Sequence, residues 1–286
     1  MVAAVAPARV DRTGEVIGGR FRIDALIGRG AMADVYRALD TATSMYVAVK
    51  ILRRSLEADP AAVQRFAREA EVQEQIRHHN VAALLDTGLT DDGEPFLALE
   101  LLRGKTLRGV LRQEGRLGPR RAVSYAWQAL GGLAAVHSLG ILHRDLKPAN
   151  LMLEPSRGPF DRVVLIDFGF ATFEGSAKLT QHGAVVGSLA YIAPERLRGD
   201  PFDHRSDLYA IGVILHEMLA GRPPFTAEDD LALVELHLHG RPPSLGPAFP
   251  RELDAVVARA LAKQPHEREP DADAMAAALA RAADVL

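Results

Sequence analysis

Two acids, an amide and a lysine stand close together near the middle of the chain. They are Asp145, Lys147 and Asn150 in one stretch, with Asp167 a short way downstream. Pro148 restrains the backbone between Lys147 and Asn150, which favours a non-helical loop that can aim these side chains inward. Asn150 and Asp167 offer hard oxygen ligands of the kind that Mg²⁺ takes together with substrate phosphates. The pattern indicates a phosphate and metal loop in which Asp145 is left to orient an attacking hydroxyl.

The composition is that of a globular protein with a sizeable core. The chain has 286 residues, of which 48% are hydrophobic and 25% charged. A net charge of -3 argues against nucleic acid or an anionic membrane surface as a partner. The lack of cysteine excludes disulfides, thiolate zinc sites and cysteine nucleophiles. The apolar start at Met1–Val10 is too short for a signal peptide, and no apolar stretch is long enough for a membrane segment, so we expect a cytoplasmic protein.

A glycine-rich turn is expected near the N-terminus, directly after a predicted strand at Phe21–Ile27. Gly28 and Gly30 have the spacing of a tight turn between two strands, whose backbone can approach a phosphate group. By itself this spacing is equally compatible with an ordinary hairpin turn.

Lys50 lies inside a run of β-forming residues, Tyr46–Leu52. A lysine in a buried strand is costly unless an acid pairs with it. The nearest candidate is Glu69, in the helix-favouring segment Ala61–Glu71. The alternative is that Glu69 is an ordinary surface residue of a surface helix.

Residue periodicity predicts the remaining elements. Pro95–Gly104 is expected to begin as a buried strand and to end in a turn. Apolar residues at helical spacing predict four long helices, at 119–140, 203–221, 250–263 and 271–286. His137, near the end of the first of these helices, is expected to be structural.

The order and spacing of these motifs resemble those of eukaryotic-like (Hanks-type) bacterial serine/threonine protein kinases. The resemblance rests on His143–Asn150, Asp167–Gly169 and Ala193–Glu195, and it covers about Arg20 to Val285. It implies an α+β, two-lobed protein kinase fold, with a small β-rich lobe that carries one key helix and a large, mainly helical lobe. The implied divisions are a leader at 1–19, the N-lobe and hinge at 20–102, and the C-lobe at 103–286.

The resemblance also implies the reaction and its cofactors. The enzyme would transfer the γ-phosphoryl group of ATP to serine or threonine hydroxyls of proteins, with Mg²⁺ or alternatively Mn²⁺. It assigns catalysis to Asp145, Lys147, Lys50 and Glu69, and metal binding to Asn150 and Asp167. Leu99 would be the gatekeeper residue beside the adenine. The residues implied to contact the nucleotide are Ile27, Gly28, Gly30, Val35, Ala48, Lys50, Leu99, Glu100, Leu102 and Met152.

Regulation is implied by a polar stretch, 171–186, that resembles an activation segment. Thr180 is its best candidate for autophosphorylation, and Arg144 would supply the cation that pairs with the phosphate. The resemblance implies roles for three other residues. Ser188 would hold Asp145 and Lys147 in register, and Asp207 would hold the backbone of the catalytic loop. Arg268 would pair with Glu195. A homodimer through the N-lobe is a further expectation.

Two residues depart from the family pattern. Ala33 replaces the third glycine of the turn, and Gln73 replaces a residue that is usually apolar. Gln73 suggests that the active arrangement needs help from dimerisation or phosphorylation. Two other function classes stay open: a small-molecule phosphotransferase, which generally lacks the equivalent of Lys147, and a non-catalytic scaffold, which usually loses the strand lysine or one of the two aspartates.

Overall fold

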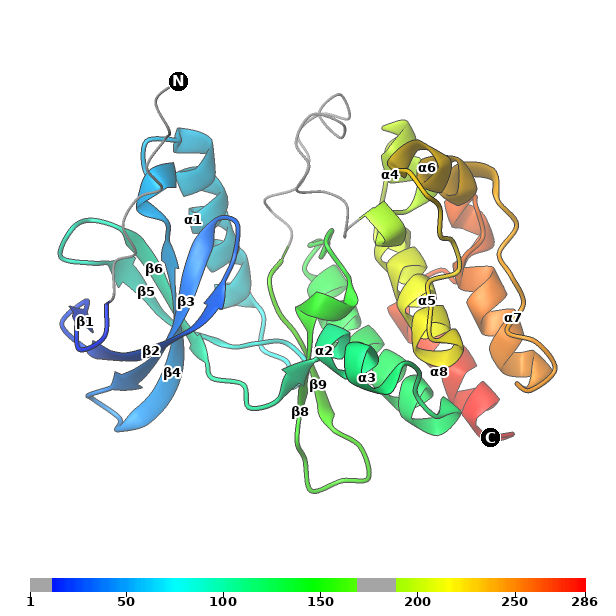
Figure 1. Cartoon of the computed structure of the whole chain (residues 1–286), viewed down its shortest axis with the longest axis horizontal. Coiled ribbons are helices and arrows are strands. Elements are labelled where there is room, and N and C mark those ends of the chain that lie inside the picture. The colour runs from blue at the N-terminus through cyan, green and yellow to red at the C-terminus, as the bar shows by residue number, and fades with distance from the viewer. Residues whose placement is uncertain (1–11, 169–188) are drawn as a thin grey trace. The chain divides into compact units, whose positions relative to one another are not determined.

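The computed structural model describes residues 12–168 and 189–286, and it divides into two compact units (Figure 1). The sheet unit comprises Met1–Glu71 and Ala83–Leu101, and the helical unit comprises Val72–Ala82 and Leu102–Leu286. The first unit is rich in strands and the second in helices, which confirms the predicted α+β class.

The sheet unit is built on one antiparallel sheet of six strands in the order β1-β2-β3-β4-β6-β5. Strand β4 is central, and its residues from Val47 to Leu52 are all buried. Because successive side chains of a strand point to opposite faces, both faces of the sheet are covered at this strand. Phe66 of the helix packs with Ala33, Leu52 and Leu97 of the sheet. The elements are β1 Val16–Ile17, β2 Phe21–Arg29, β3 Ala33–Asp40, β4 Met45–Leu52, α1 Pro60–Gln75, β5 Leu84–Leu89 and β6 Pro95–Glu100.

Residues 12–19 are folded onto the sheet unit, which differs from the leader expected at 1–19. Strand β1 pairs with β2, and Ile17 is fully buried in the core of the unit. Arg12 is buried against Glu94, and the two form an ion pair. A strand of two residues is too short to show an alternating pattern, which explains why the sequence did not indicate it. Residues 1–11 lie outside the described part of the chain.

The helical unit carries seven α-helices and a small antiparallel sheet in its described residues (Figure 1). Val72 and Ile76 join its hydrophobic core, so the segment between them belongs to this unit although it was expected in the small lobe. The elements are β7 Lys105–Thr106, α2 Leu107–Glu114, α3 Pro119–Ser138, β8 Leu151–Glu154, β9 Arg162–Leu165, α4 Pro194–Arg198, α5 Arg205–Ala220, α6 Asp230–His239, α7 Arg251–Ala260 and α8 Ala272–Ala283, with short 3-10 turns η2 Pro148–Asn150, η4 Leu189–Tyr191 and η5 Pro265–Glu267.

Helix α5 is the central element of the helical unit, since every residue from Ser206 to Leu219 is buried. A helix that is covered on all sides must find partners for each of its polar residues. Close packing is visible at Gly212, where a Cβ atom would lie 2.7 Å from the Cβ of Ala260 on α7. The buried polar residues of α5 therefore bind to neighbouring segments, and this determines where those segments lie.

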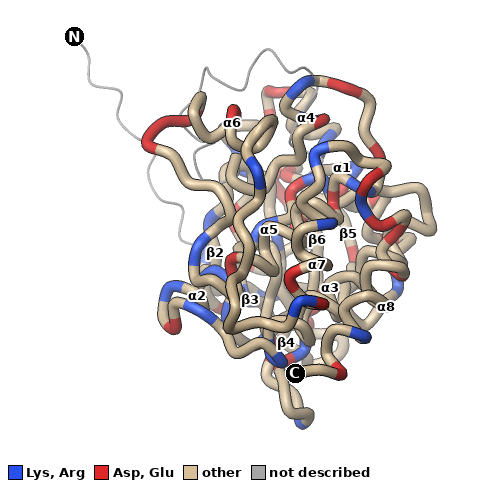
Figure 2. Tube along the Cα trace, turned by 90° about the vertical axis from the view of Figure 1, so that its right-hand side faces the viewer, with Lys and Arg blue, Asp and Glu red and all other residues tan. Residues whose placement is uncertain are grey.

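Charged residues are distributed over both units. Figure 2 shows basic and acidic positions interspersed along the trace, which agrees with the small net charge of -3. Among the described residues, no helix combines the length with the apolar composition needed to cross a membrane.

Candidate active site

The loop between α3 and β8 brings together three of the residues that the sequence singled out. The ammonium of Lys147 lies 2.7 Å from Oδ2 of Asp145. The amide nitrogen of Asn150 donates to the backbone oxygen of Asp145 at 2.8 Å and to its Oδ2 at 3.1 Å. Lys147 is extended and Pro148 starts the 3-10 turn η2, a single short helical turn where the sequence predicted a non-helical loop. The carboxylate of Asp145 is thus oriented by two neighbours and stays partly exposed.

Asp207, at the start of α5, holds the backbone of this loop. Its carboxylate accepts hydrogen bonds from the backbone nitrogens of His143 at 2.9 Å and Arg144 at 3.0 Å. Arg144 has a φ of 68°, a left-handed conformation that costs free energy in a residue other than glycine. Burial alone would raise the pKa of Asp207, but hydrogen bonds from His137 and His143 hold that pKa below its usual range. Asp207 therefore stays ionised and stabilises the strained turn.

His137 is a residue whose part in this site the sequence did not reveal. Its Nε2 lies 2.9 Å from Oδ2 of Asp207, the oxygen that also accepts from the backbone of His143. His137 comes from the end of α3 and Asp207 from the start of α5, so only the packing of the two helices brings them together. No spacing in the sequence could have indicated this contact.

Asn150 and Asp167 stand at neighbouring ends of the β8–β9 hairpin. The register pairs Leu151 with Leu165, and the backbone nitrogen of Ile166 donates to the oxygen of Asn150 at 3.0 Å. The amide nitrogen of Asn150 is already engaged with Asp145, so its side-chain oxygen remains as a ligand. An amide oxygen and an exposed carboxylate suit Mg²⁺ when substrate phosphates supply the other ligands. In the described part of the chain no group of three or more His, Cys, Asp or Glu could hold a metal by itself.

His143 and Phe168 form the buried floor next to these ligands. Their rings lie 4.9 Å apart, and both side chains are buried. Burial lowers the pKa of His143, so its imidazole is neutral at pH 7. Gln73, the departure noted on α1, is buried as well, and its Oε1 has no hydrogen-bond partner among the described residues. A buried polar atom of this kind costs about 1–3 kcal/mol.

In the sheet unit, Lys50 and Glu69 form the buried ion pair that the sequence predicted. Nζ of Lys50 lies 2.6 Å from Oε1 of Glu69, and both residues are buried. Lys50 comes from the central strand β4 and Glu69 from α1. The alternative, a surface glutamate on a surface helix, is therefore wrong.

The sheet unit also holds most of the residues expected to contact a nucleotide. Gly28 lies opposite Val35 in the β2–β3 pairing, and Ala48 lies opposite Leu99 in the β4–β6 pairing. Gly30 closes the turn with a 2.8 Å hydrogen bond to the oxygen of Ala33. The remaining candidates of this unit are Ile27, which is exposed, Lys50 and Glu100, and the two in the helical unit, Leu102 and Met152, are half-buried.

Ala33 shows why the loss of the third glycine is tolerated. Its side chain is buried and packs with Leu52, Phe66 and Leu97. The added methyl group therefore contributes to the core of the sheet unit. The substitution leaves the tight turn at Gly30 in place.

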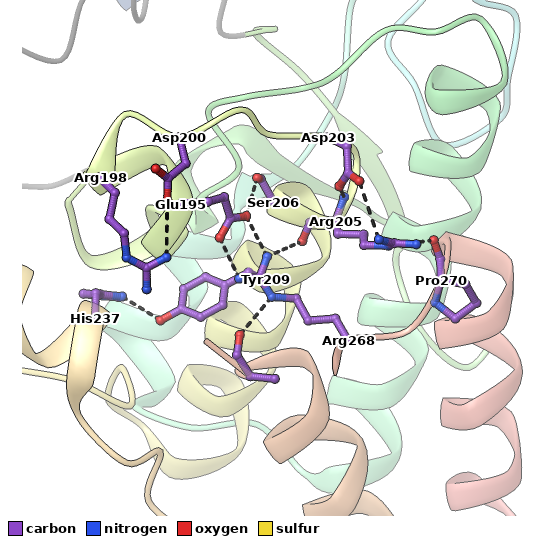
Figure 3. A network of polar contacts seen from close by, with 11 residues as sticks. Glu195, Arg198, Asp200, Asp203, Arg205, Ser206, Tyr209, His237, Arg268 and Pro270 are labelled. Atoms are coloured by element: carbon purple, nitrogen blue, oxygen red, sulfur yellow. Dashed lines mark hydrogen bonds and ion pairs between the residues drawn. The ribbon is translucent and has the colours of Figure 1, made fainter. Parts of the chain in front are cut away.

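Glu195 and Arg268 form the most buried charge cluster of the helical unit (Figure 3). Both carboxylate oxygens of Glu195 accept from the guanidinium of Arg268 at 2.7 Å, and the hydroxyl of Ser206 donates to Oε1 at 2.5 Å. The guanidinium carbon of Arg268 lies 4.9 Å from the centre of the Tyr209 ring. Burial would raise the pKa of Glu195, but the bonds from Arg268 hold it below its usual range.

Comparison with known proteins agrees with this geometry. Residues 21–277 match the model of the protein kinase domain. The chain belongs to the protein kinase family.

Bacterial serine/threonine kinases are among its relatives. The chain is 38% identical over 287 residues to serine/threonine-protein kinase pkn3 of Myxococcus xanthus, covering 96% of this chain and 52% of the relative. It is 39% identical over 278 residues to a probable serine/threonine-protein kinase, PknB, of Corynebacterium glutamicum, covering 93% of this chain and 42% of the relative. The chain therefore spans about half the length of these relatives, or somewhat less.

A solved kinase structure has the same fold. The crystal structure of the PknI kinase domain of Mycobacterium tuberculosis matches with a TM-score of 0.71 at 27% identity, covering 96% of this chain and 100% of that one. The match confirms the two-lobed kinase fold expected from the sequence.

The expected regulatory residues of this kinase domain are described only in part. Thr180 and Ser188 lie outside the described residues. The guanidiniums of Arg144 and Arg196 lie 5.8 and 5.4 Å from the centre of the Phe202 ring, and Arg196 donates to the backbone oxygen of Arg144 at 2.5 Å. Two arginines on one aromatic ring next to the catalytic loop form a basic cluster that suits a phosphate group.

Proposed function

We propose that the protein is an ATP-dependent and Mg²⁺-dependent serine/threonine protein kinase. The observation that carries this proposal is the catalytic loop, in which Asp145 is oriented by Lys147 and Asn150 and the backbone is held by Asp207. The kinase names of the relatives support the same reaction and the serine and threonine acceptors.

The residues divide the work of phosphoryl transfer between them. Asp145 orients the acceptor hydroxyl and takes its proton as the new bond forms between that oxygen and the γ-phosphorus. The bond from this phosphorus to the bridging oxygen breaks at the same time, and ADP leaves. Lys147, next to Asp145, balances negative charge on the moving group. Such positioning and charge stabilisation account for most of the catalysis in this reaction class.

The metal and the other phosphates would be held by two further pairs of residues. Asn150 and Asp167 would bind Mg²⁺, which neutralises phosphate charge when it is present. Lys50, held by Glu69, would contact the α- and β-phosphates. Mn²⁺ satisfies the same oxygen donors and is expected to substitute for Mg²⁺.

Autophosphorylation is part of the proposal. Arg144 and Arg196 would bind a phosphate on Thr180. We also propose that the protein acts in signalling in the cytoplasm and that a homodimer through the sheet unit promotes the reaction. The amide oxygen of Gln73, which is buried and has no hydrogen-bond partner among the described residues, is the structural observation that favours such help.

The proposal is tested by incubating the protein with ATP and a generic protein substrate, with Mg²⁺ or Mn²⁺, and by mapping the phosphorylated residues with mass spectrometry. We expect phosphate on serine and threonine of the substrate and on Thr180 of the enzyme. Phosphate on tyrosine alone, or transfer to a small-molecule hydroxyl in place of protein, would contradict the proposed acceptor class.

A further inference from the structure

The β8–β9 hairpin carries a charge pair next to its connecting loop (Figure 1). Glu154, the last residue of β8, lies opposite Arg162, the first residue of β9, in the register of the two strands. Nη1 of Arg162 donates to Oε2 of Glu154 at 2.9 Å. The side chains of Glu154 and Arg162 are 20% and 16% exposed. Opposite charges that face each other on neighbouring strands stabilise the pairing modestly, so the pair alone would be an ordinary feature of a sheet.

Each member of the pair also binds the backbone of another segment. The second carboxylate oxygen of Glu154, Oε1, accepts a hydrogen bond from the backbone nitrogen of Arg103 at 3.1 Å. Nε of Arg162 donates to the backbone oxygen of His79 at 2.8 Å. Arg103 lies where the chain enters the helical unit, and His79 belongs to the separate segment Val72–Ala82 of the same unit. The pair therefore fastens two distant segments of the chain to the hairpin.

The backbone after Arg103 runs in direct contact with β8. Gly104 has a φ of 148°, and a Cβ atom at this position would lie 1.9 Å from the backbone oxygen of Leu153. A side chain does not fit into that space, so the close approach requires glycine. Strand β7 begins at the next residue, and Lys105 pairs with Leu153. Residues 103–105 are thus held against β8 by their backbone and, at Arg103, by the carboxylate of Glu154.

The segment that Glu154 holds includes a residue expected to bind the nucleotide. Leu102 directly precedes Arg103, and its backbone is expected to hydrogen-bond with adenine. The peptide unit between them is planar and trans, so the direction of the Arg103 N–H also sets the direction of the Leu102 carbonyl. Met152, the other nucleotide contact expected in this unit, stands two residues before Glu154 on β8. A single hydrogen bond therefore connects Glu154 with the backbone that would face the base.

We propose that Glu154 is a positioning residue for the adenine base, that it acts through the peptide unit between Leu102 and Arg103, and that Arg162 orients its carboxylate. The inference rests on the proposed protein kinase function and deepens it, since it adds a residue to the nucleotide site of that enzyme. Glu154 acts without touching the nucleotide. Its effect is limited to the base, because other residues are assigned to the phosphates and the metal.

A peptide unit that is already oriented lowers the free energy needed to bind the base, because less backbone must be ordered on binding. Without the carboxylate, the N–H of Arg103 would turn to water, and the Leu102 carbonyl would sample other directions. The measured affinity for the base then falls in proportion to the population that keeps the binding orientation. The rate of transfer from bound ATP depends on the catalytic loop, so it should not change.

The experiment separates recognition of the base from recognition of the phosphates. Adenosine, which carries no phosphate, and tripolyphosphate, which carries no base, are measured as inhibitors that compete with ATP. Wild type, Glu154→Met, Glu154→Gln and the control Glu114→Met are assayed for kcat, for KM of ATP and for both inhibition constants. Glutamine keeps an oxygen that can accept from Arg103, and methionine does not. Glu114 is a matched control, because it forms a 2.8 Å ion pair with Arg121 in the same unit.

In Glu154→Met, we expect KM of ATP and the inhibition constant of adenosine to rise by about fivefold or more, the size expected for one hydrogen bond. Values of kcat and of the inhibition constant of tripolyphosphate should stay within about twofold of wild type, as expected when only binding of the base is weakened. Glu154→Gln should recover most of the affinity for adenosine. Glu114→Met should equal wild type in all of these constants.

An active Glu154→Met enzyme with an unchanged inhibition constant of adenosine would overturn the inference, and the pair would be an ordinary cross-strand link. Equal increases for adenosine and tripolyphosphate, or a fall in kcat alone, would also overturn it, because they indicate a general distortion. If Glu154→Met fails to fold, Glu154→Asp decides, since its shorter side chain keeps the charge and withdraws the acceptor from Arg103. It should weaken adenosine and spare tripolyphosphate, and equal values to wild type for both would refute the role of Glu154. A wild-type enzyme that binds neither inhibitor and transfers no phosphate would contradict the proposed kinase function, and this inference with it.

Discussion

Two ion pairs of the helical unit have the same separation of 2.7 Å and very different surroundings. In the catalytic loop, the side chains of Lys147 and Asp145 are 24% and 20% exposed. In the pair of Arg268 with Glu195, the exposed fractions are 0% and 3%. The guanidinium of Arg268 also donates to the backbone oxygens of Ala262 and Arg205.

The difference in exposure distinguishes charged residues that take part in the reaction from charged residues that stabilise the fold. An exposed carboxylate can exchange its partner for a substrate hydroxyl at little cost, because water compensates for the lost contact. A buried pair cannot exchange partners, because either charge alone would be left without solvent. Substitutions in the first pair and its neighbours should therefore affect turnover, and those in the second should affect the free energy of unfolding.

The largest expected effect is that of Asp167→Asn on the rate of phosphoryl transfer. Asp167 is exposed, so the free energy of unfolding should change by less than about 0.5 kcal/mol. Turnover should be abolished, which means a fall of about a thousandfold or more, because the metal loses its carboxylate ligand. Lys50→Met, in the sheet unit, should likewise abolish transfer, because the phosphates lose the cation that Glu69 holds. Initial rates of transfer from labelled ATP measure turnover, and urea unfolding measures stability. Clear residual turnover in either variant would contradict the roles assigned to Asp167 and Lys50.

Removal of Arg268 should have the largest effect on stability. Arg268→Ala leaves Glu195 buried without its cation, and we expect a loss of about 3–5 kcal/mol in the free energy of unfolding. Arg198→Ala is the matched control, because its pair with Asp200 is 3.6 Å long and more exposed. The control should lose less than about 1 kcal/mol. Equal losses in urea unfolding of the two variants would show that burial does not distinguish these ion pairs.

His237 should make stability fall in acid. It is fully buried, and burial, with a smaller contribution from Lys263, lowers its pKa from 6.5 to about 4. The unfolded chain therefore binds the proton more tightly, and stability that is present above pH 6.5 is lost as the pH falls towards 4. The expected loss from this residue between pH 7 and pH 5 is about 2 kcal/mol.

The measurement is urea unfolding at pH 7 and pH 5 for wild type and His237→Gln. Glutamine keeps a polar partner for the hydroxyl of Tyr209, which lies 2.8 Å from Nδ1 of His237, and it does not titrate in this range. The variant should lose clearly less stability than wild type over the same interval. An identical pH dependence of the two proteins would mean that His237 is not responsible.

The smallest expected effect is a gain in stability at Gln73. Its buried Oε1 lacks a partner among the described residues, so Gln73→Met should raise the free energy of unfolding by about 1 kcal/mol. Thermal unfolding of wild type and variant measures the change. A loss of stability would show that the amide of Gln73 stabilises the fold. It would then be wrong to count its Oε1 as a buried polar atom that costs free energy.

Much of the site could be predicted from the sequence because its residues are close together in the chain or have unusual surroundings. Asp145, Lys147 and Asn150 lie within six residues, and Lys50 stands in an apolar strand where only a pair makes it tolerable. The long helices were predicted for a similar reason, since apolar spacing and terminal glycines such as Gly221, which has a φ of 76°, are local signals.

Contacts that depend on tertiary packing could not be predicted in this way. His137 meets Asp207 and Arg108 meets Glu217 only because α5 lies beside α3 and close to α2. The folding of Arg12 onto Glu94 similarly joins residues that are far apart in the chain. For none of these residues does the surrounding sequence indicate which distant residue is the partner.

The most direct test of the central claim is transfer of labelled phosphate from ATP, in the presence of Mg²⁺, by wild type and by Asp145→Asn. The account predicts label on a protein substrate and on Thr180 or its neighbours with wild type, and none above background with the variant, while both proteins bind ATP and unfold at the same urea concentration. Measurable ATP binding without any transfer by wild type, or equal transfer by the two proteins, would contradict the assignment of Asp145 as the residue that orients the acceptor hydroxyl.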